Sequence, residues 1–297
     1  EETRANSALG AASNVDLIGD YTIRYIFQVY NAKGDQSKAP VTQYSDNKSV
    51  SFPVRLVPNR DYRFVVWADI VKESDKADLH YDTSHFPAIS LKDTWVAMDE
   101  TRDAYTVSEE VKEFNSAKSI SLTLKRPFAK LRVITTDMEE LLGLELDKAT
   151  VSYVTKHYNT FNALQSKAVD ESKNRDIKHE NYTINDYETT NGKVLFTDYF
   201  FAENDVVKFN MSVLMSDGKT VDRSFNTDIP VKRNYLTTLI GDILTEGNNI
   251  TVKVEEGFAG ESGIEDGKTF AKVDTAEELK DAIAKGMKFR EGTDKIW

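Results

Sequence analysis

The stretch Thr22-Ile-Arg-Tyr-Ile-Phe-Gln-Val29 decides the fold class, because its apolar residues recur at every second position. One face carries Ile23, Tyr25, Phe27 and Val29, and the other carries Thr22, Arg24 and Gln28. A period of two predicts a half-buried β-strand, with its apolar face against a core and its polar face in solvent.

The same alternation recurs along the chain and predicts further strands. Residues 62–67 carry apolar side chains on both faces, so we expect this strand to be buried on both sides. The dipeptides Asp217-Gly218 and Asn191-Gly192 are typical of hairpin turns. The other expected strands cover residues 50–56, 120–124, 129–133, 149–155, 193–200, 206–215, 219–225 and 250–254, with one bent strand or two short ones around Pro127.

The length of 297 residues suggests two domains, at roughly 150 residues per domain. Many short strands with turn residues between them predict an all-β chain built from sandwiches. We therefore expect β-sandwich domains at residues 1–134 and 135–257, followed by a linker and a short helical tail at 258–297. The helix is indicated by Thr275-Ala-Glu-Glu278, which matches a capping box and precedes apolar residues at helical spacing.

The composition argues against several classes of function. The net charge is −11 at pH 7, which disfavours binding to nucleic-acid phosphates, and no run approaches the roughly 18 apolar residues of a membrane-spanning helix. The chain has no cysteine, which excludes disulfides, thiolate metal sites and cysteine nucleophiles. It starts at Glu1 without a methionine, so we expect a processed chain whose targeting segment is out of view.

Signals for catalysis are weak. Neither a Gly-x-Ser-x-Gly elbow nor a Walker A or Gly-x-Gly-x-x-Gly loop occurs, although a glycosidase-type carboxylate pair stays open among 49 acids. His80 and His85 flank the one local cluster of ligand-type side chains, but a five-residue offset places them on opposite faces of a strand. We interpret this cluster as a polar surface loop, and His157 and His179 in the same way. The sequence predicts no enzyme, no cofactor and no metal site.

Four segments, in order, resemble the fimbrillin family of Bacteroidales, which includes FimA-type surface lipoproteins. Val57-Pro-Asn-Arg-Asp-Tyr-Arg-Phe-Val-Val-Trp-Ala-Asp69 resembles a strand of that family's first domain, and Asp99-Glu-Thr-Arg-Asp-Ala-Tyr105 resembles the following loop. Leu122-Thr-Leu-Lys-Arg-Pro-Phe-Ala-Lys-Leu-Arg-Val133 is similar to the segment that closes the first domain. Val231-Lys-Arg-Asn-Tyr-Leu-Thr-Thr-Leu-Ile-Gly-Asp-Ile-Leu-Thr245 resembles a segment late in the second domain.

The resemblance implies two tandem transthyretin-like β-sandwiches in an exported lipoprotein of the cell surface, located in the outer membrane or a fimbrium. Members of that family are structural or adhesive subunits of fimbriae. Their partners are other fimbrial subunits, with a host protein or glycan as a further candidate. Assembly is by strand exchange, in which proteolysis after a basic residue frees an N-terminal strand and the open groove accepts a strand from the next subunit. Arg4 is the matching basic position.

The two ends of the chain depart from the family pattern. We expect the lipidated cysteine and the first strand to be missing from this chain, so a membrane would be contacted only through a lipid that it lacks. Residues 268–283 resemble the capping helix that opens many right-handed parallel β-helix domains, and an isolated helix packed on the second domain is the alternative. Three functions stay open: a fimbrial subunit, a surface glycan-binding or glycan-processing protein with accessory sandwiches, and a metal-dependent hydrolase using His80 and His85.

Overall fold

The computed structural model describes residues 20–45, 49–92, 97–184, 188–245, 250–258, 270–272, 288–291 and 295–296. This part of the chain is all-β, as predicted, and contains no α-helix. Its short 3-10 turns are η1 (Phe86–Ala88), η2 (Glu100–Arg102) and η3 (Met138–Leu141). No helix in the described ranges has the length and apolar character needed to cross a bilayer.

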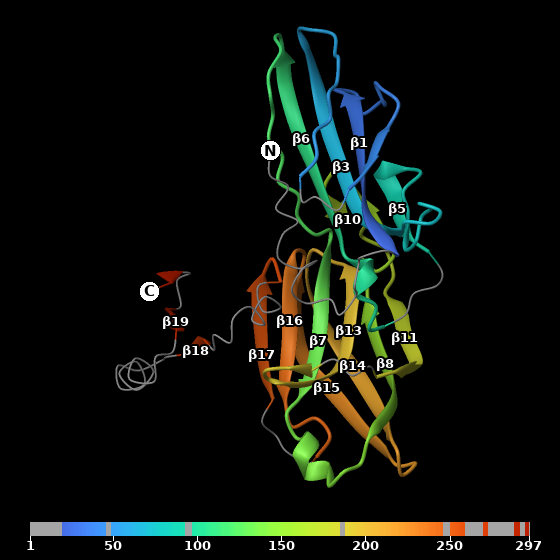
Figure 1. Ribbon diagram of the computed structural model, residues 1–297, viewed down its shortest axis with the longest axis vertical. Coiled ribbons are helices and arrows are strands. Elements are labelled where there is room, and N and C mark those ends of the chain that lie inside the picture. Colours follow the sequence, from blue (N-terminus) through green and yellow to red (C-terminus); the bar gives the residue numbers. More distant parts are fainter. Residues whose placement is uncertain are drawn as a thin grey trace.

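One four-stranded antiparallel sheet, here called the upper sheet, forms the top of the molecule in Figure 1. In order across the sheet, its strands are β2 (Val41–Tyr44), β1 (Tyr21–Asn31), β3 (Arg60–Lys72) and β6 (Ala104–Phe114). β1 and β3 pair along their full overlap, from Tyr21 opposite Lys72 to Asn31 opposite Tyr62. Both strands are buried on both faces, so each face of the upper sheet is covered by other parts of the chain.

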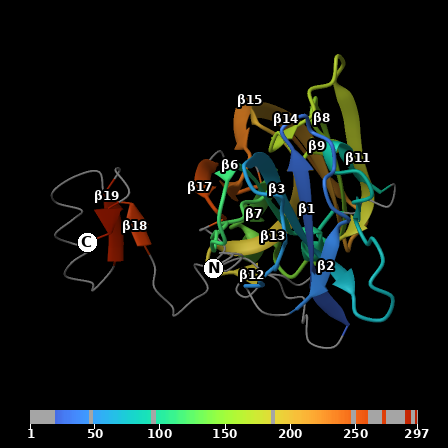
Figure 2. The ribbon, with the colours of Figure 1, turned by 90° about the horizontal axis from the view of Figure 1, so that it is seen from above.

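Two further sheets form the second half of the molecule, and Figure 2 shows them as two layers. The first has the order β12 (Glu188–Thr189), β13 (Gly192–Phe201), β7 (Phe128–Thr135), β16 (Tyr235–Gly241) and β17 (Thr251–Glu256). The second has the order β11 (Arg175–Thr183), β8 (Leu146–Thr155), β14 (Asn204–Met215) and β15 (Thr220–Lys232). The two layers share one apolar core, to which β7, β13, β8 and β14 all contribute, and β7 pairs in parallel with β16.

A small sheet joins the two halves. It has the order β10 (Lys167–Ala168), β9 (Thr160–Asn162), β5 (Ile89–Leu91) and β4 (Tyr81–Asp82), so it takes two strands from each half of the chain. Beneath it, Trp67 of the upper sheet lies in one apolar cluster with Phe161 and Phe201. This cluster contains side chains from both halves of the chain. The face of the upper sheet that carries Trp67 is therefore covered by the second half of the chain.

The five strands predicted in the second half are confirmed, as β8, β13, β14, β15 and β17. The hairpin at Asp217-Gly218 joins β14 to β15, and the one at Asn191-Gly192 joins β12 to β13. β6, β11 and β16 were not predicted from alternation. The helix expected around residues 275–287 lies outside the described residues, while the described parts of the tail form β18 (Phe270–Lys272), β19 (Lys288–Glu291) and β20 (Lys295–Ile296). The domain division at 134/135 and 257/258 stays a prediction.

The solvent-facing side predicted for β1 is wrong, because its polar residues are buried. Arg24 lies opposite Asp69 in the ladder and donates to both carboxylate oxygens, through Nε at 2.9 Å and Nη2 at 2.7 Å. Its Nη1 donates to Asp78 at 2.6 Å. A guanidinium paired on two sides can be buried where a lone charge could not, so polar alternation did not mark a solvent face here.

Two predicted strands, 50–56 and 120–124, are also wrong. Both segments run in the described part of the chain without joining a sheet. Their alternation is nevertheless real: Val50, Phe52, Val54, Leu56, Ile120 and Leu122 pack against the face of the upper sheet that carries Phe27 and Phe64, and the residues between them are exposed.

A buried charge network ties η2 to the second half of the chain. Asp198 on β13 accepts hydrogen bonds from Arg102, from the Tyr153 hydroxyl and from His179, whose Nε2 lies 2.8 Å from the carboxylate. Burial would raise the pKa of Asp198, but the charges of His179 and Arg102 hold it at about 2, below its ordinary value of 3.8. The carboxylate therefore stabilises the fold above pH 4, and this contribution is lost as the pH falls toward 2.

We expect Asp198→Asn to lower the unfolding free energy by about 3–5 kcal/mol, because it leaves Arg102 buried without its counter-charge. Urea denaturation at pH 7 measures this change. Asp228→Asn is the matched control, since Asp228 pairs with Lys208 in solvent, and it should change stability by about 0.5 kcal/mol or less. An equal effect of the two substitutions would contradict the prediction.

Gly192 offers a second test of the fold. Its φ is +132°, and a Cβ at this position would lie 2.1 Å from the backbone oxygen of Thr135 on β7. Gly192→Ala should therefore cost about 2–4 kcal/mol in thermal or urea unfolding, through strain and displaced backbone. Gly218 also has a positive φ, +82°, but has open space around it. Gly218→Ala should cost about 1 kcal/mol, so equal losses would rule out the clash as the cause.

Candidate functional site

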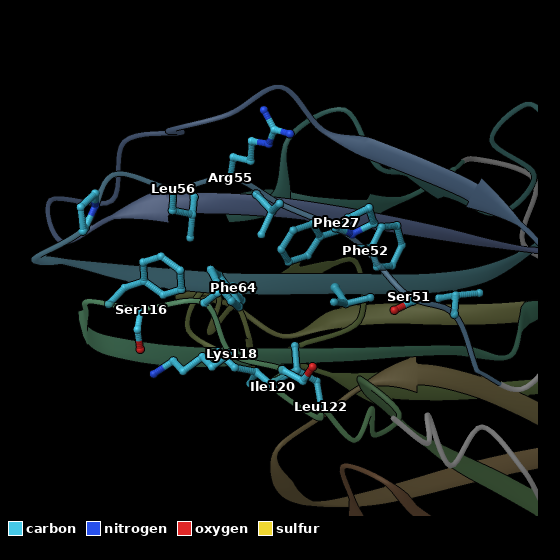
Figure 3. Close-up of a pocket in the computed structure, with 18 of the residues that line it drawn as sticks. Phe27, Ser51, Phe52, Arg55, Leu56, Phe64, Ser116, Lys118, Ile120 and Leu122 are labelled. Atoms are coloured by element: carbon cyan, nitrogen blue, oxygen red, sulfur yellow. The ribbon is translucent and has the colours of Figure 1, made fainter.

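The candidate site is an apolar groove of about 730 Å³ on the upper sheet. Residues of the sheet form its floor, and its two walls include the segments 50–56 and 120–124 that alternation wrongly predicted as strands. We call residues 50–57 wall one and residues 115–124 wall two. Figure 3 shows the side chains of both walls lining the space between them.

The floor is the apolar face of β1 and β3. Phe27 and Phe64 lie there in edge-to-face contact, with ring centroids 5.4 Å apart, and Val66 continues the same face of β3. This is the face that the alternation of residues 22–29 predicts as buried. Sheet pairing thus presents a row of aromatic and branched side chains to whatever covers the sheet.

Wall one covers part of this floor. Phe52 stacks on Phe27 with centroids 5.2 Å apart, while Ser51, Pro53 and Arg55 are exposed. The wall is fixed at one end by Gln43, which donates to the carbonyl of Ser51 at 2.8 Å. At the other end the hydroxyl of Tyr62 bonds to both backbone polar groups of Val57, at 3.0 and 3.1 Å.

Wall two covers the opposite side. Leu124 is buried at 3% exposure, whereas Ile120 and Leu122 are half-buried. The segment is fixed just beyond its end, where Lys125 and Thr106 exchange two backbone hydrogen bonds of 2.8 and 2.9 Å. Its other end follows directly on β6, which ends at Phe114.

Between these anchors, the backbone of both walls has no pairing partner among the described residues. Within the part of the chain that the structure describes, the backbone groups of residues 52–56 and 117–124 make no hydrogen bond to a neighbouring segment. An extended segment with an apolar inward face and free N–H and C=O groups is the edge of a sheet that lacks a neighbour. Pro53 has no N–H to donate, which also suits an edge position.

The two walls run in opposite directions. In Figure 3, wall one passes from Ser51 at the right to Leu56 at the left, and wall two passes from Ser116 at the left to Leu122 at the right. A strand laid between them could bond to both walls, and it would be antiparallel to one and parallel to the other. The site is therefore suited in shape to an extended peptide.

The histidine cluster noted in the sequence is dispersed in the structure, and the surface interpretation of three histidines is wrong. His80 is buried, with Nε2 2.6 Å from the Thr101 hydroxyl, whereas His85 is exposed at the start of η1. His157 and His179 are buried too, and bond to the carbonyl of Val169 and to Asp198. No group of metal-ligating side chains occurs among the described residues. Arg4, the expected processing position, lies outside them.

His80 gives the structure a predicted pH dependence. Burial is the main reason that its pKa falls from 6.5 to about 4, and the charges of Arg102 and Lys92 add to this against the pull of Asp99. In the unfolded chain His80 takes up a proton near pH 6.5, so the folded state loses stability as the pH falls from 6.5 to 4. His80→Gln should remove about 1–3 kcal/mol of that loss.

Urea denaturation at pH 7 and pH 4.5 measures the effect. The matched control is His85→Gln, which replaces an exposed ring and should leave the pH dependence unchanged. If the wild type and His80→Gln lose equal stability over this range, His80 is not the responsible group.

Alternation alone could have identified the wall residues, but not the groove. The period of two at 50–56 and 120–124 marks extended segments with one buried face. Whether such a segment has a partner on its edge depends on the pairing of the whole sheet, which a local pattern does not contain. The groove exists because no described strand pairs with the two walls.

Several solved structures are similar to this chain. A solved structure from Bacteroides ovatus, described provisionally as a cell adhesion protein, is 12% identical, and the match covers 84% of this chain and 89% of that one with a TM-score of 0.51. The tip fimbrial protein Mfa3 from Porphyromonas gingivalis is 12% identical over 80% of this chain and 94% of that one, with a TM-score of 0.43. A fimbrial assembly protein from Parabacteroides distasonis is 11% identical over 84% and 92%, with a TM-score of 0.44.

At these identities the likeness concerns the fold alone. The search of curated proteins gives no match. The model of a family of unknown function, DUF6562, matches residues 1–291, and the chain belongs to that family.

Proposed function

We propose that this chain is a structural or adhesive subunit of cell-surface fimbriae, and that a strand of another subunit pairs within the groove. The observation that carries the proposal is the pair of unpaired walls over an apolar floor. A guest strand would supply what both walls lack, since its backbone could bond to each of them and its alternate side chains could pack on the half-buried Val54, Ile120 and Leu122.

A strand bound in the groove would be stabilised by both its backbone and its side chains. Each backbone hydrogen bond formed in the groove contributes about 0.5–1.5 kcal/mol, and each apolar side chain buried against the floor adds about 1.5–3 kcal/mol. Because the walls are anchored at their ends, the groove is already ordered, and binding loses little entropy on the acceptor side.

Repeated use of this contact would build a filament. A strand leaving one subunit and entering the groove of the next is a head-to-tail contact, which does not close on itself. The likeness in fold to a structure described as a cell adhesion protein is consistent with such a role. The alternative, a surface glycan-binding or glycan-processing protein, stays a prediction without a specific observation in its favour.

The finer expectations from the resemblance belong to this proposal. They are two transthyretin-like domains at residues 1–134 and 135–257, cleavage after Arg4, and anchoring of the precursor in the outer membrane through a lipidated residue ahead of this chain. An N-terminal strand removed by that cleavage would have occupied the groove before assembly.

Leu122→Glu should block assembly. Leu122 lies half-buried on wall two and lines the groove, so a carboxylate there would face the apolar side of an incoming strand. We expect at least about a tenfold drop in the amount of subunit found in fimbriae, because covering an unpaired charge costs several kcal/mol. Immunogold electron microscopy and the amount of detergent-resistant polymer from the producing cells measure it.

Thr123→Glu is the matched control, since Thr123 is the exposed neighbour on the same wall. It introduces the same charge one position away and should leave incorporation intact. Far-ultraviolet circular dichroism and melting curves of both purified variants establish that each is folded. Equal incorporation of the two folded variants would show that the groove does not receive a strand.

A further inference from the structure

We propose that the strand accepted by the groove carries an acidic side chain at one end, where Arg55 and Lys118 flank it. This inference rests on the proposed function, because it specifies the chemistry of the guest for the same groove. It concerns which strand binds rather than whether one does.

The charge of the groove lining is the first observation. The described residues that line it include two cations, Arg55 and Lys118, and no Asp or Glu. The chain as a whole has the opposite balance, with 49 acids against 38 bases. An acidic protein thus presents a basic lining at this apolar groove, and charge complementarity favours an acidic guest.

The position of the two cations is the second observation. Arg55 lies on wall one and Lys118 on wall two, both toward the end of the groove marked by Leu56 and Ser116 (Figure 3). The opposite end, marked by Ser51 and Leu122, is lined by serine and apolar side chains. The charge is therefore concentrated at one end, and an acid is needed only at the matching end of the guest.

The partners of these cations are the third observation. Neither Arg55 nor Lys118 makes an ion pair with another described residue, although several exposed cations elsewhere do. A guest strand between the walls would remove water from the space that separates them. A carboxylate on the guest would offset that loss with a charge-assisted hydrogen bond, whereas a lysine or arginine would be repelled from both walls.

Peptide binding to the purified full chain tests the proposal. The probes are fluorescein-labelled peptides of about eight residues, the length of an ordinary strand, in which valine alternates with threonine. One set ends in two glutamates, at either the amino or the carboxyl end, and the matched sets end in two glutamines or two lysines. Fluorescence anisotropy at low salt gives the dissociation constants.

We expect one glutamate peptide to bind about three- to tenfold more tightly than its glutamine counterpart, and the lysine peptide to bind most weakly. The end that carries the preferred glutamates reports the direction of the guest, because the cations occupy one end only. The advantage should shrink in 1 M salt, where the Debye length falls to about 3 Å.

Substitutions of the two cations test whether they cause the preference for the glutamate peptide. Arg55→Ala and Lys118→Ala should each reduce the advantage of the glutamate peptide by about two- to threefold while leaving the glutamine peptide unaffected. Lys253→Ala is the control, since Lys253 is exposed on β17, away from the groove, and its loss changes the net charge equally.

The failures are distinguishable. If all peptides bind in the groove with equal affinity, the acidic guest is wrong while strand acceptance stands. If no peptide of any charge binds, or if Leu122→Glu binds as the wild type does, the groove accepts no strand and both proposals fall. If binding requires removal of residues 1–19, the guest is this chain's own amino-terminal segment, which overturns a guest from another subunit.

Discussion

The unpaired backbone of the two walls is the constraint on which the rest of this structure depends. A segment that alternates apolar and polar residues needs a core on one face and a hydrogen-bonding neighbour on each edge. Residues 52–56 and 117–124 obtain the core, through Phe27 and Phe64, but no described segment pairs with them. Within the described chain, a second sheet therefore begins over the upper sheet without a strand between the two walls, and that space is the groove.

The groove can stay open because the sheet beneath it is held from the other side. Trp67, Phe161 and Phe201 lie in one cluster below the upper sheet, and this cluster contains side chains from both halves of the chain. The Arg24–Asp69 pair lies on that same buried side. These contacts do not involve the walls, so the acceptor does not depend on the guest for its order, which lowers the entropic cost of binding.

The sequence predicted the all-β class, the Asp217-Gly218 hairpin and the apolar floor, because each follows from period and turn chemistry within a few residues. It failed where burial depends on a distant partner. Arg24 and Gln28 were assigned to solvent by their polarity, yet Arg24 is covered because Asp69 neutralises it from the paired strand. His179 was assigned to the surface for the same reason, and it is buried against Asp198. The walls failed in a different way. Their alternation of buried and exposed residues was predicted correctly, but they join no sheet because no described strand pairs with them.

An unpaired sheet edge can bind strands of unrelated chains, and the residues of the walls disfavour such non-specific pairing. Pro53 removes one donor from wall one, so a guest must meet that edge in a register that needs no hydrogen bond there. Arg55 and Lys118 disfavour pairing between the walls of two copies, because such contacts bring like charges together across the new ladder. An apolar strand with a carboxylate at the matching end avoids both penalties. The features that keep identical grooves apart are thus the same ones that would select the strand that fills them.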